Sequence, residues 1–258
     1  MIKTIITLIL IFNISIANEI NLSTGIQSTQ IKSKNISVYG TFVNLEIDNK
    51  YQRFSNNIKL NINLDNKADQ LDTDHIPVWF EAYLDSKYNL YNTKNINLDY
   101  LINVNWKMNT SSNIEQHLIV ENGFGVSYNS DNIQVGLNSY AGYFYLEIDD
   151  DYPRLFGWER VDLANHTSSY SLNPYVVFKF NKNNDLEIFY QVWKDFQNKD
   201  LLKSFIMKYT YKYNNLISLS LKYKKNKYNL EQFSSNNLQP IMDFNTEEIY
   251  KLYFTYKY

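Results

Sequence analysis

The chain has 258 residues, enough for one large domain, and its formal net charge of −2 gives no reason to expect a nucleic-acid partner. It contains no cysteine, which excludes disulfides, thiol catalysis and cysteine-ligated metal sites, and its 7 glycines and 4 prolines are too few for a fibrous or low-complexity chain. A hydrophobic content of 44% with a mean hydropathy of −0.43 argues against a helical membrane protein, but suits a chain whose lipid-facing and water-facing residues alternate.

The first 17 residues have the three parts of a secretory signal peptide. A positive start at Lys3 is followed by a mostly apolar run over residues 4–16, and Ser15 and Ala17 place small residues where a signal peptidase cuts. A membrane-spanning helix is the competing interpretation, but the run is shorter than the roughly 20 residues that a helix needs. We therefore predict a cleaved signal peptide over 1–17 and a single mature domain over 18–258.

Beyond residue 17 no segment keeps a 3.6-residue period, and apolar residues instead occupy every second position, as in β-strands. The alternation is clearest at 58–64, 98–107, 204–213, 217–224 and 249–258. We predict twelve strands at 20–30, 37–47, 55–65, 77–90, 97–107, 114–128, 133–148, 166–181, 184–195, 201–213, 216–228 and 246–258.

The strands are longer than those of most globular proteins and match the 9 to 11 residues that cross a bilayer at a tilt. A soluble β-sandwich would also alternate, but tyrosines stand at the strand ends, where their hydroxyl groups can reach the headgroup region. Lipid offers the backbone no hydrogen bonds, so strands in it must close into a barrel. The predicted fold is all-β: a transmembrane antiparallel up-and-down barrel of about twelve strands.

An even strand number puts both chain ends on the periplasmic side. The connections on the periplasmic side are then mostly short: 48–54, 91–96, 129–132, 182–183 and 214–215. The long connections lie on the outer, extracellular side: 66–76, 149–165 and 229–245. Ten or fourteen strands are the alternatives, because 149–171 has room for a hairpin.

The last strand carries apolar residues at every second position and ends on an aromatic residue. It resembles the C-terminal insertion signal of Gram-negative outer-membrane proteins, and its residues are Tyr250, Leu252, Phe254, Tyr256 and Tyr258. The resemblance implies a location in the cell outer membrane, insertion by the barrel-assembly machinery, and contact with outer-membrane lipid and lipopolysaccharide. Acidic residues at 69–74 and 149–151 would suit Ca²⁺ or lipopolysaccharide bridged by divalent cations, although solvated loop charge is the simpler interpretation.

If the apolar residues face lipid, the alternate set lines the lumen, with acids leaning to the first half of the chain and lysines to the second. Such charges would orient polar solutes in a narrow pore, unless they pair across a plugged interior. The predicted pore-lining residues are Glu81, Asp85, Asp99, Glu115, Glu121, Lys179, Lys208, Lys212, Lys222, Lys224 and Lys251. In size and strand number the chain resembles the small oligogalacturonate-specific porins, which implies acidic solutes, although arginine, typical of their lumen, is rare here.

One short stretch suits a hydrolase. His166 and Ser168 share a strand face, as in outer-membrane phospholipase A and the lipid A deacylases, where serine is the nucleophile and histidine the base. By that resemblance Asn173 would orient the histidine. The phospholipase family usually follows its serine with Asn-Gly, whereas Ser169 and Tyr170 follow here, so a hydrated strand entrance is the competing interpretation.

The sequence thus predicts an outer-membrane channel for diffusion of small hydrophilic solutes, acidic ones among them. A lipid hydrolase and a non-conducting structural or adhesion barrel are the alternatives. Neither a cofactor nor a metal site is expected, since His75 and His117 are isolated and no phosphate-binding glycine loop occurs.

Overall fold

The computed structural model describes residues 19–31, 36–65, 78–108, 114–148, 165–229 and 246–258. Within these ranges all regular structure is strand: β1 (Glu19–Ile31), β2 (Ile36–Tyr51), β3 (Phe54–Asp65), β4 (Val78–Asn92), β5 (Ile96–Met108), β6 (Ile114–Asn129), β7 (Ile133–Ile148), β8 (Asn165–Asn181), β9 (Asn184–Asp195), β10 (Asp200–Lys212), β11 (Ile217–Tyr228) and β12 (Thr246–Lys257). A helix long and apolar enough to span a membrane is not found in the described part of the chain.

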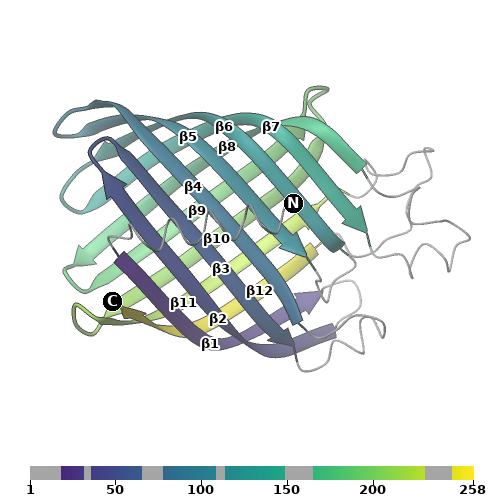
Figure 1. Ribbon diagram of the computed structural model, residues 1–258, viewed down its shortest axis with the longest axis horizontal. Helices are drawn as coiled ribbons and strands as arrows, with labels where there is room; N and C mark the ends of the chain where they lie inside the picture. The colour runs from purple at the N-terminus through teal and green to yellow at the C-terminus, as the bar shows by residue number, and fades with distance from the viewer. Residues whose placement is uncertain (1–18, 32–35, 66–77, 109–113, 149–164, 230–245) are drawn as a thin grey trace, which may run out of the picture.

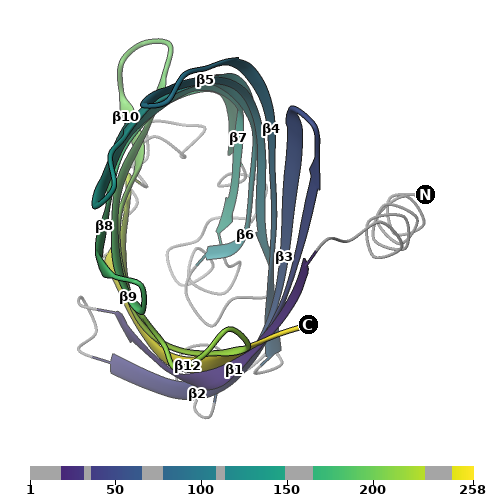
Figure 2. The same cartoon turned by 90° about the vertical axis from the view of Figure 1, so that its left-hand side faces the viewer.

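Each strand pairs antiparallel with the next, and β12 pairs with β1, so the sheet closes on itself (Figures 1 and 2). The closing ladder runs from Asn21 opposite Lys257 to Ile31 opposite Glu247. Closure leaves no sheet edge, and every strand therefore has a hydrogen-bonding neighbour on both sides. The predicted antiparallel barrel of about twelve strands is confirmed.

The strand boundaries follow the predicted ones within two residues, except at the end of β2. Residues 48–51, which were predicted to lie in a connection, extend β2 and pair with the first residues of β3. The turn is only Gln52 and Arg53, and Gln52 adopts a positive φ of 52°. The prediction failed here because Asp48, Asn49 and Lys50 are polar like a loop, although they continue the ladder.

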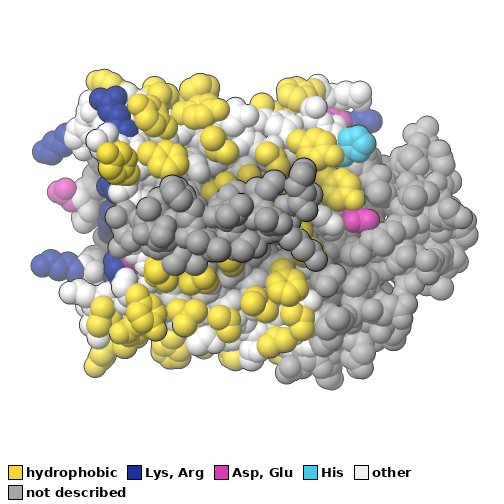
Figure 3. All heavy atoms as spheres, viewed as in Figure 1, with side chains coloured by type: hydrophobic (Ala, Val, Ile, Leu, Met, Phe, Trp, Pro, Cys, Tyr) yellow, Lys and Arg dark blue, Asp and Glu magenta, His cyan; other side chains and the backbone are white. Residues whose placement is uncertain are grey.

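Alternation separates an apolar outer face from a polar inner face. Outward residues such as Ile26 and Phe254 are each 60% exposed, whereas the inward Ser23 and Asn63 are almost fully buried. Hydrophobic side chains cover the visible outer wall along the barrel, and charged side chains gather toward its two ends (Figure 3). Such a surface is stable in lipid, because it exposes apolar groups that water would not solvate well.

The two ends of the barrel differ. The short turns at 52–53, 93–95, 130–132, 182–183 and 213–216 share one end with the C-terminus and the start of β1 (left in Figure 1). The predicted long connections at 66–76, 149–165 and 229–245 leave strands at the opposite end and lie almost wholly outside the described residues, as do the acidic residues at 69–74 and 149–151. The predicted signal peptide, residues 1–17, also lies outside them. We refer to the two ends as the short-turn end and the long-loop end.

Candidate functional site

The lumen is the candidate site, because the inner face gathers polar side chains from nearly every strand. A cavity of ≈ 410 Å³ lies inside the barrel and is lined by residues of β1–β5 and β9–β12. Its charged lining residues are Glu46, Lys59, Asp85, Glu187, Lys208, Lys222, Lys224 and Lys251. Side chains of opposite walls thus line one cavity.

Ion pairs between adjacent strands join four of these eight charged residues. Lys59 lies 3.0 Å from Glu46, across β2 and β3, and Lys208 lies 3.0 Å from Glu187, across β9 and β10. Pairs of this kind neutralise each other on one wall, so they add little to a field across the lumen.

The lysines of β11 differ from these pairs. Lys222 stands directly opposite Lys251 of β12 and opposite Lys208 of β10 in the strand register. Among the described residues, neither Lys222 nor Lys224 has an ion-pair partner. Like charges side by side repel each other, so this wall would attract anions.

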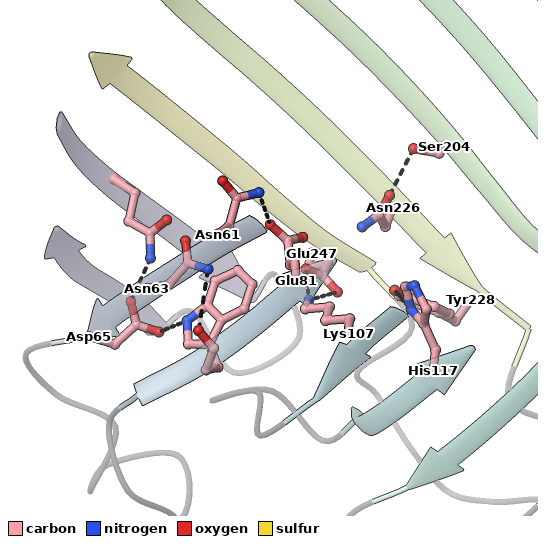
Figure 4. Close-up of polar contacts among 12 residues, drawn as sticks. Asn61, Asn63, Asp65, Glu81, Lys107, His117, Ser204, Asn226, Tyr228 and Glu247 are labelled. Carbon is pink, nitrogen blue, oxygen red and sulfur yellow. Dashed lines mark hydrogen bonds and ion pairs between the residues drawn. The ribbon is translucent and has the colours of Figure 1, made fainter. Parts of the chain in front are cut away.

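Two contacts bridge opposite walls near the long-loop end (Figure 4). Lys107 Nζ of β5 lies 3.2 Å from a carboxylate oxygen of Glu247 on β12, and both side chains are buried. His117 of β6 and Tyr228 of β11 are hydrogen-bonded, with 3.3 Å between Nδ1 and the hydroxyl oxygen. Because such contacts need side chains from both walls to meet, they narrow the passage.

Aromatic rings surround the buried cations. Lys251 Nζ donates to Asn63 Oδ1 at 3.0 Å and lies 4.4 Å from the ring centroid of Phe42. Lys107 Nζ lies 4.8 Å from the ring centroid of Trp79, whose indole nitrogen donates to Asp65 at 2.7 Å. Cation–π contacts of this kind stabilise desolvated ammonium groups and fix the position of both lysines.

An apolar cluster fills the neighbouring part of the interior. It consists of Ile119, Phe144, Leu146, Trp193, Leu201, Leu202 and Tyr228, all at most 3% exposed. The cluster belongs to β6, β7, β9, β10 and β11, near the long-loop end. The interior is therefore apolar on this side, whereas the cavity has a largely polar lining.

Glu121 of β6 is the buried carboxylate of this region. Its Oε2 accepts hydrogen bonds from Ser171 Oγ at 2.9 Å and Trp193 Nε1 at 3.2 Å, although these residues lie on β8 and β9. Its Oε1 is buried without a hydrogen-bond partner among the described residues. The carboxylate therefore ties three strands of the inner wall together.

Similarity to known proteins is found in structure and not in sequence. No protein-family model matches the chain, and no curated protein matches it significantly. The NanC porin has a TM-score of 0.54 at 9% identity, over 92% of this chain and 98% of that one. OmpF of Salmonella typhi, solved with daunomycin, has a TM-score of 0.50 at 9% identity, over 93% and 97%. The KdgM porin, solved with disordered oligogalacturonate, gives 0.49 at 10% identity, over 92% and 98%.

The chain has a porin fold. The predicted likeness to the small outer-membrane porins is thus confirmed at the level of the fold, which is also the architecture expected for the predicted outer-membrane location.

The strand register puts all the predicted pore-lining residues but one, Glu115, on the inner face of this porin fold. They are Glu81, Asp85, Asp99, Glu121, Lys179, Lys208, Lys212, Lys222, Lys224 and Lys251. The side chain of Glu115 lies outside the described residues. Lys179 and Lys212 lie close to the short-turn end, away from the cavity.

Sequence reasoning missed the inward aromatic residues. Phe42 and Trp79 occupy inward positions, and Phe42 packs against Tyr253 with 5.5 Å between ring centroids. One signal in the sequence could have revealed them: an aromatic residue at a position where the alternating pattern otherwise has a polar, inward-facing residue. Gly25, which lies between Phe42 and Tyr253 in the register, was a second signal, because a Cβ there would lie only 2.5 Å from the Tyr253 Cβ.

The candidate hydrolase residues are not brought together. His166 and Ser168 face outward at the long-loop end and are exposed, and the His166 ring stacks on Tyr143 at 5.9 Å. Asn173 lies on the opposite face of β8, buried in the interior. A side chain on the inner face of a strand cannot orient one on the outer face.

Proposed function

We propose that this protein is an outer-membrane channel through which small hydrophilic solutes diffuse, acidic solutes among them. The observation that carries the proposal is a closed barrel with a polar interior whose cavity is lined by Lys222 and Lys224, neither of which has an ion-pair partner among the described residues. Charged groups in a narrow aqueous passage set which solutes enter it.

The passage is narrow. Wide aqueous channels need about 16 strands, and barrels of fewer strands fill increasingly with side chains. Here Lys107, Glu247, His117 and Tyr228 meet across the lumen. We therefore expect selective passage of small solutes rather than general diffusion.

The partners follow from the same proposal. The mature chain, residues 18–258, would be delivered by its signal peptide and inserted by the barrel-assembly machinery. That machinery would read five outward residues, all of them exposed: Tyr250, Leu252, Phe254, Tyr256 and Tyr258. Membrane lipid and lipopolysaccharide would then surround the barrel.

Single-channel recording tests the proposal. Refolded protein comprising residues 18–258 should give discrete conductance steps in planar bilayers, and small sugars, nucleosides or organic anions that enter the lumen should block them. Absence of any conductance from a protein that still migrates as a folded barrel would contradict the channel and support a structural or adhesion barrel.

We also infer that the protein is not a lipid hydrolase. The inference is supported by the separation of Asn173 from His166 and Ser168, which leaves the histidine without the predicted orienting residue. Purified protein and its Ser168→Ala variant should hydrolyse phospholipid and lipid A substrates equally little. Hydrolysis that is lost in the variant would overturn this inference.

A further inference from the structure

Charged residues are unevenly distributed over the outer face of the barrel. On β1 to β6, no described residue that the register points outward is charged. On β9 to β11, four outward lysines stand close together at the long-loop end: Lys194, Lys203, Lys225 and Lys227. We call these four residues the outer lysine patch.

The patch carries more positive than negative charge. Asp200 pairs with Lys203 and lies 3.7 Å from Lys194, and Glu248 lies 3.2 Å from Lys225. Lys227 is exposed and has no ion-pair partner in the described part of the chain. In the described part of the chain, two acids, Asp200 and Glu248, therefore accompany the four lysines of the patch.

The strand register indicates that this excess of positive charge destabilises the barrel. Lys203 and Lys227 stand directly opposite each other on neighbouring strands. Like charges in that position are destabilising, and among the described residues the outer face offers no further acid next to Lys227. An external anion would remove the repulsion.

Aromatic side chains lie on the membrane side of the patch. Phe205 is opposite Tyr190 and Lys225, and its ring centroid is 6.2 Å from that of Tyr223. Tyr223 in turn lies 5.0 Å from Tyr250. Rings of this kind sit at the level of the lipid headgroups, so the lysines lie at or just beyond that level, on the side of the long loops.

We propose that the outer lysine patch binds the phosphate groups of the phosphorylated glycolipid of the outer leaflet, lipopolysaccharide. Phosphate supplies the missing negative charge, and the acyl chains of the same molecule can lie against Phe205, Tyr223 and Tyr250 below. A zwitterionic phospholipid fits less well, because its amine already neutralises its phosphate. The proposal rests on the barrel's location in an outer membrane and not on conduction.

Binding to a defined glycolipid tests the proposal. Refolded full-length mature barrel in detergent micelles is titrated with diphosphoryl lipid A, and bound lipid is counted by native mass spectrometry. Removing two lysines at a membrane surface should weaken binding about 30-fold in the Lys203→Gln/Lys227→Gln variant. Heat-modifiable gel migration confirms that the variant folds. The single Lys227→Gln variant, which breaks no ion pair, should lose about fivefold and serves if the double variant does not fold.

The same strand supplies a matched control. Lys222→Gln/Lys224→Gln removes the same charge from the inner face of β11 and should leave lipid A binding unchanged. Equal loss in both double variants, or none in the outer one, would overturn the proposal. Equally tight binding of anionic phosphatidylglycerol would overturn the choice of glycolipid. A barrel that binds lipid A but conducts no ions would contradict only the proposed channel.

Discussion

At the scale of single residues, a glycine explains how Glu121 reaches two strands away. Gly142 of β7 stands directly opposite Glu121 in the register, and the missing side chain lets the carboxylate pass over β7 to Ser171 and Trp193. A Cβ added to Gly142 would lie 2.1 Å from the Val120 carbonyl oxygen and 2.8 Å from the Glu121 Cβ. Both neighbours belong to β6, so the strand itself would have to move.

Gly142→Val should therefore destabilise the barrel by about 1–3 kcal/mol, the usual range for overpacking. The free energy of unfolding is measured by urea titration of refolded protein in detergent micelles. Ala141→Val is the matched control, because Ala141 is exposed on the outer face, and its stability should stay near wild type. Equal stability of the two variants would contradict the close approach at Gly142.

The buried pair of Lys107 and Glu247 gives a second residue-scale prediction. Lys107→Met leaves the Glu247 carboxylate buried without its cation, which typically costs about 3–5 kcal/mol. Lys107→Met/Glu247→Gln removes both charges and should recover most of that loss. Urea titration of the single and double variants measures the coupling. Additive losses would show that the two side chains do not meet across the lumen.

At the scale of the elements, strands are readable in the sequence because a period of two residues makes one face apolar. That is why β7 and β9 have the predicted boundaries, while the polar end of β2 was taken for a loop. The apolar–polar alternation does not show where a strand with a polar end stops. Asp48 and Lys50 are polar, yet they continue the strand because they pair with β3 through their backbones.

β12 offers a test of which face meets lipid. Leu252 is 42% exposed on the outer face, close to the middle of the strand. A lysine on the lipid face near the bilayer midplane costs about 2–4 kcal/mol, so Leu252→Lys should lower the free energy of unfolding in lipid vesicles by about that amount. Thr255→Lys adds the same charge to the inner face and should cost less. The reverse order would mean that the two faces are assigned wrongly.

At the scale of the whole molecule, the two-residue alternation predicted which charged residues face the interior, but it did not show which of them are in contact. Lys107 and Glu247 are 140 residues apart and touch only because the closed barrel brings β5 and β12 across a narrow interior. Barrel closure, strand tilt and the shape of the cross-section decide such contacts. The two-residue alternation within a strand predicts none of these. The predicted charge difference between walls is therefore reduced by pairs such as Lys59 with Glu46. In the proposed channel, the lysines of β11 would be the charges that act on solutes.

The lysines of β11 lead to a prediction for the charge selectivity of the whole channel. Lys222→Gln/Lys224→Gln removes two inward charges that form no ion pair in the described part of the chain, so the ratio of anion to cation permeability should fall. Losing about 1 kcal/mol of attraction in an aqueous lumen corresponds to roughly a fivefold change. The ratio is measured from the reversal potential across a salt gradient. Lys203→Gln/Lys227→Gln also removes two charges, but from the outer face, and should keep the wild-type ratio. Unchanged selectivity in the inner variant would mean that solutes do not pass Lys222 and Lys224.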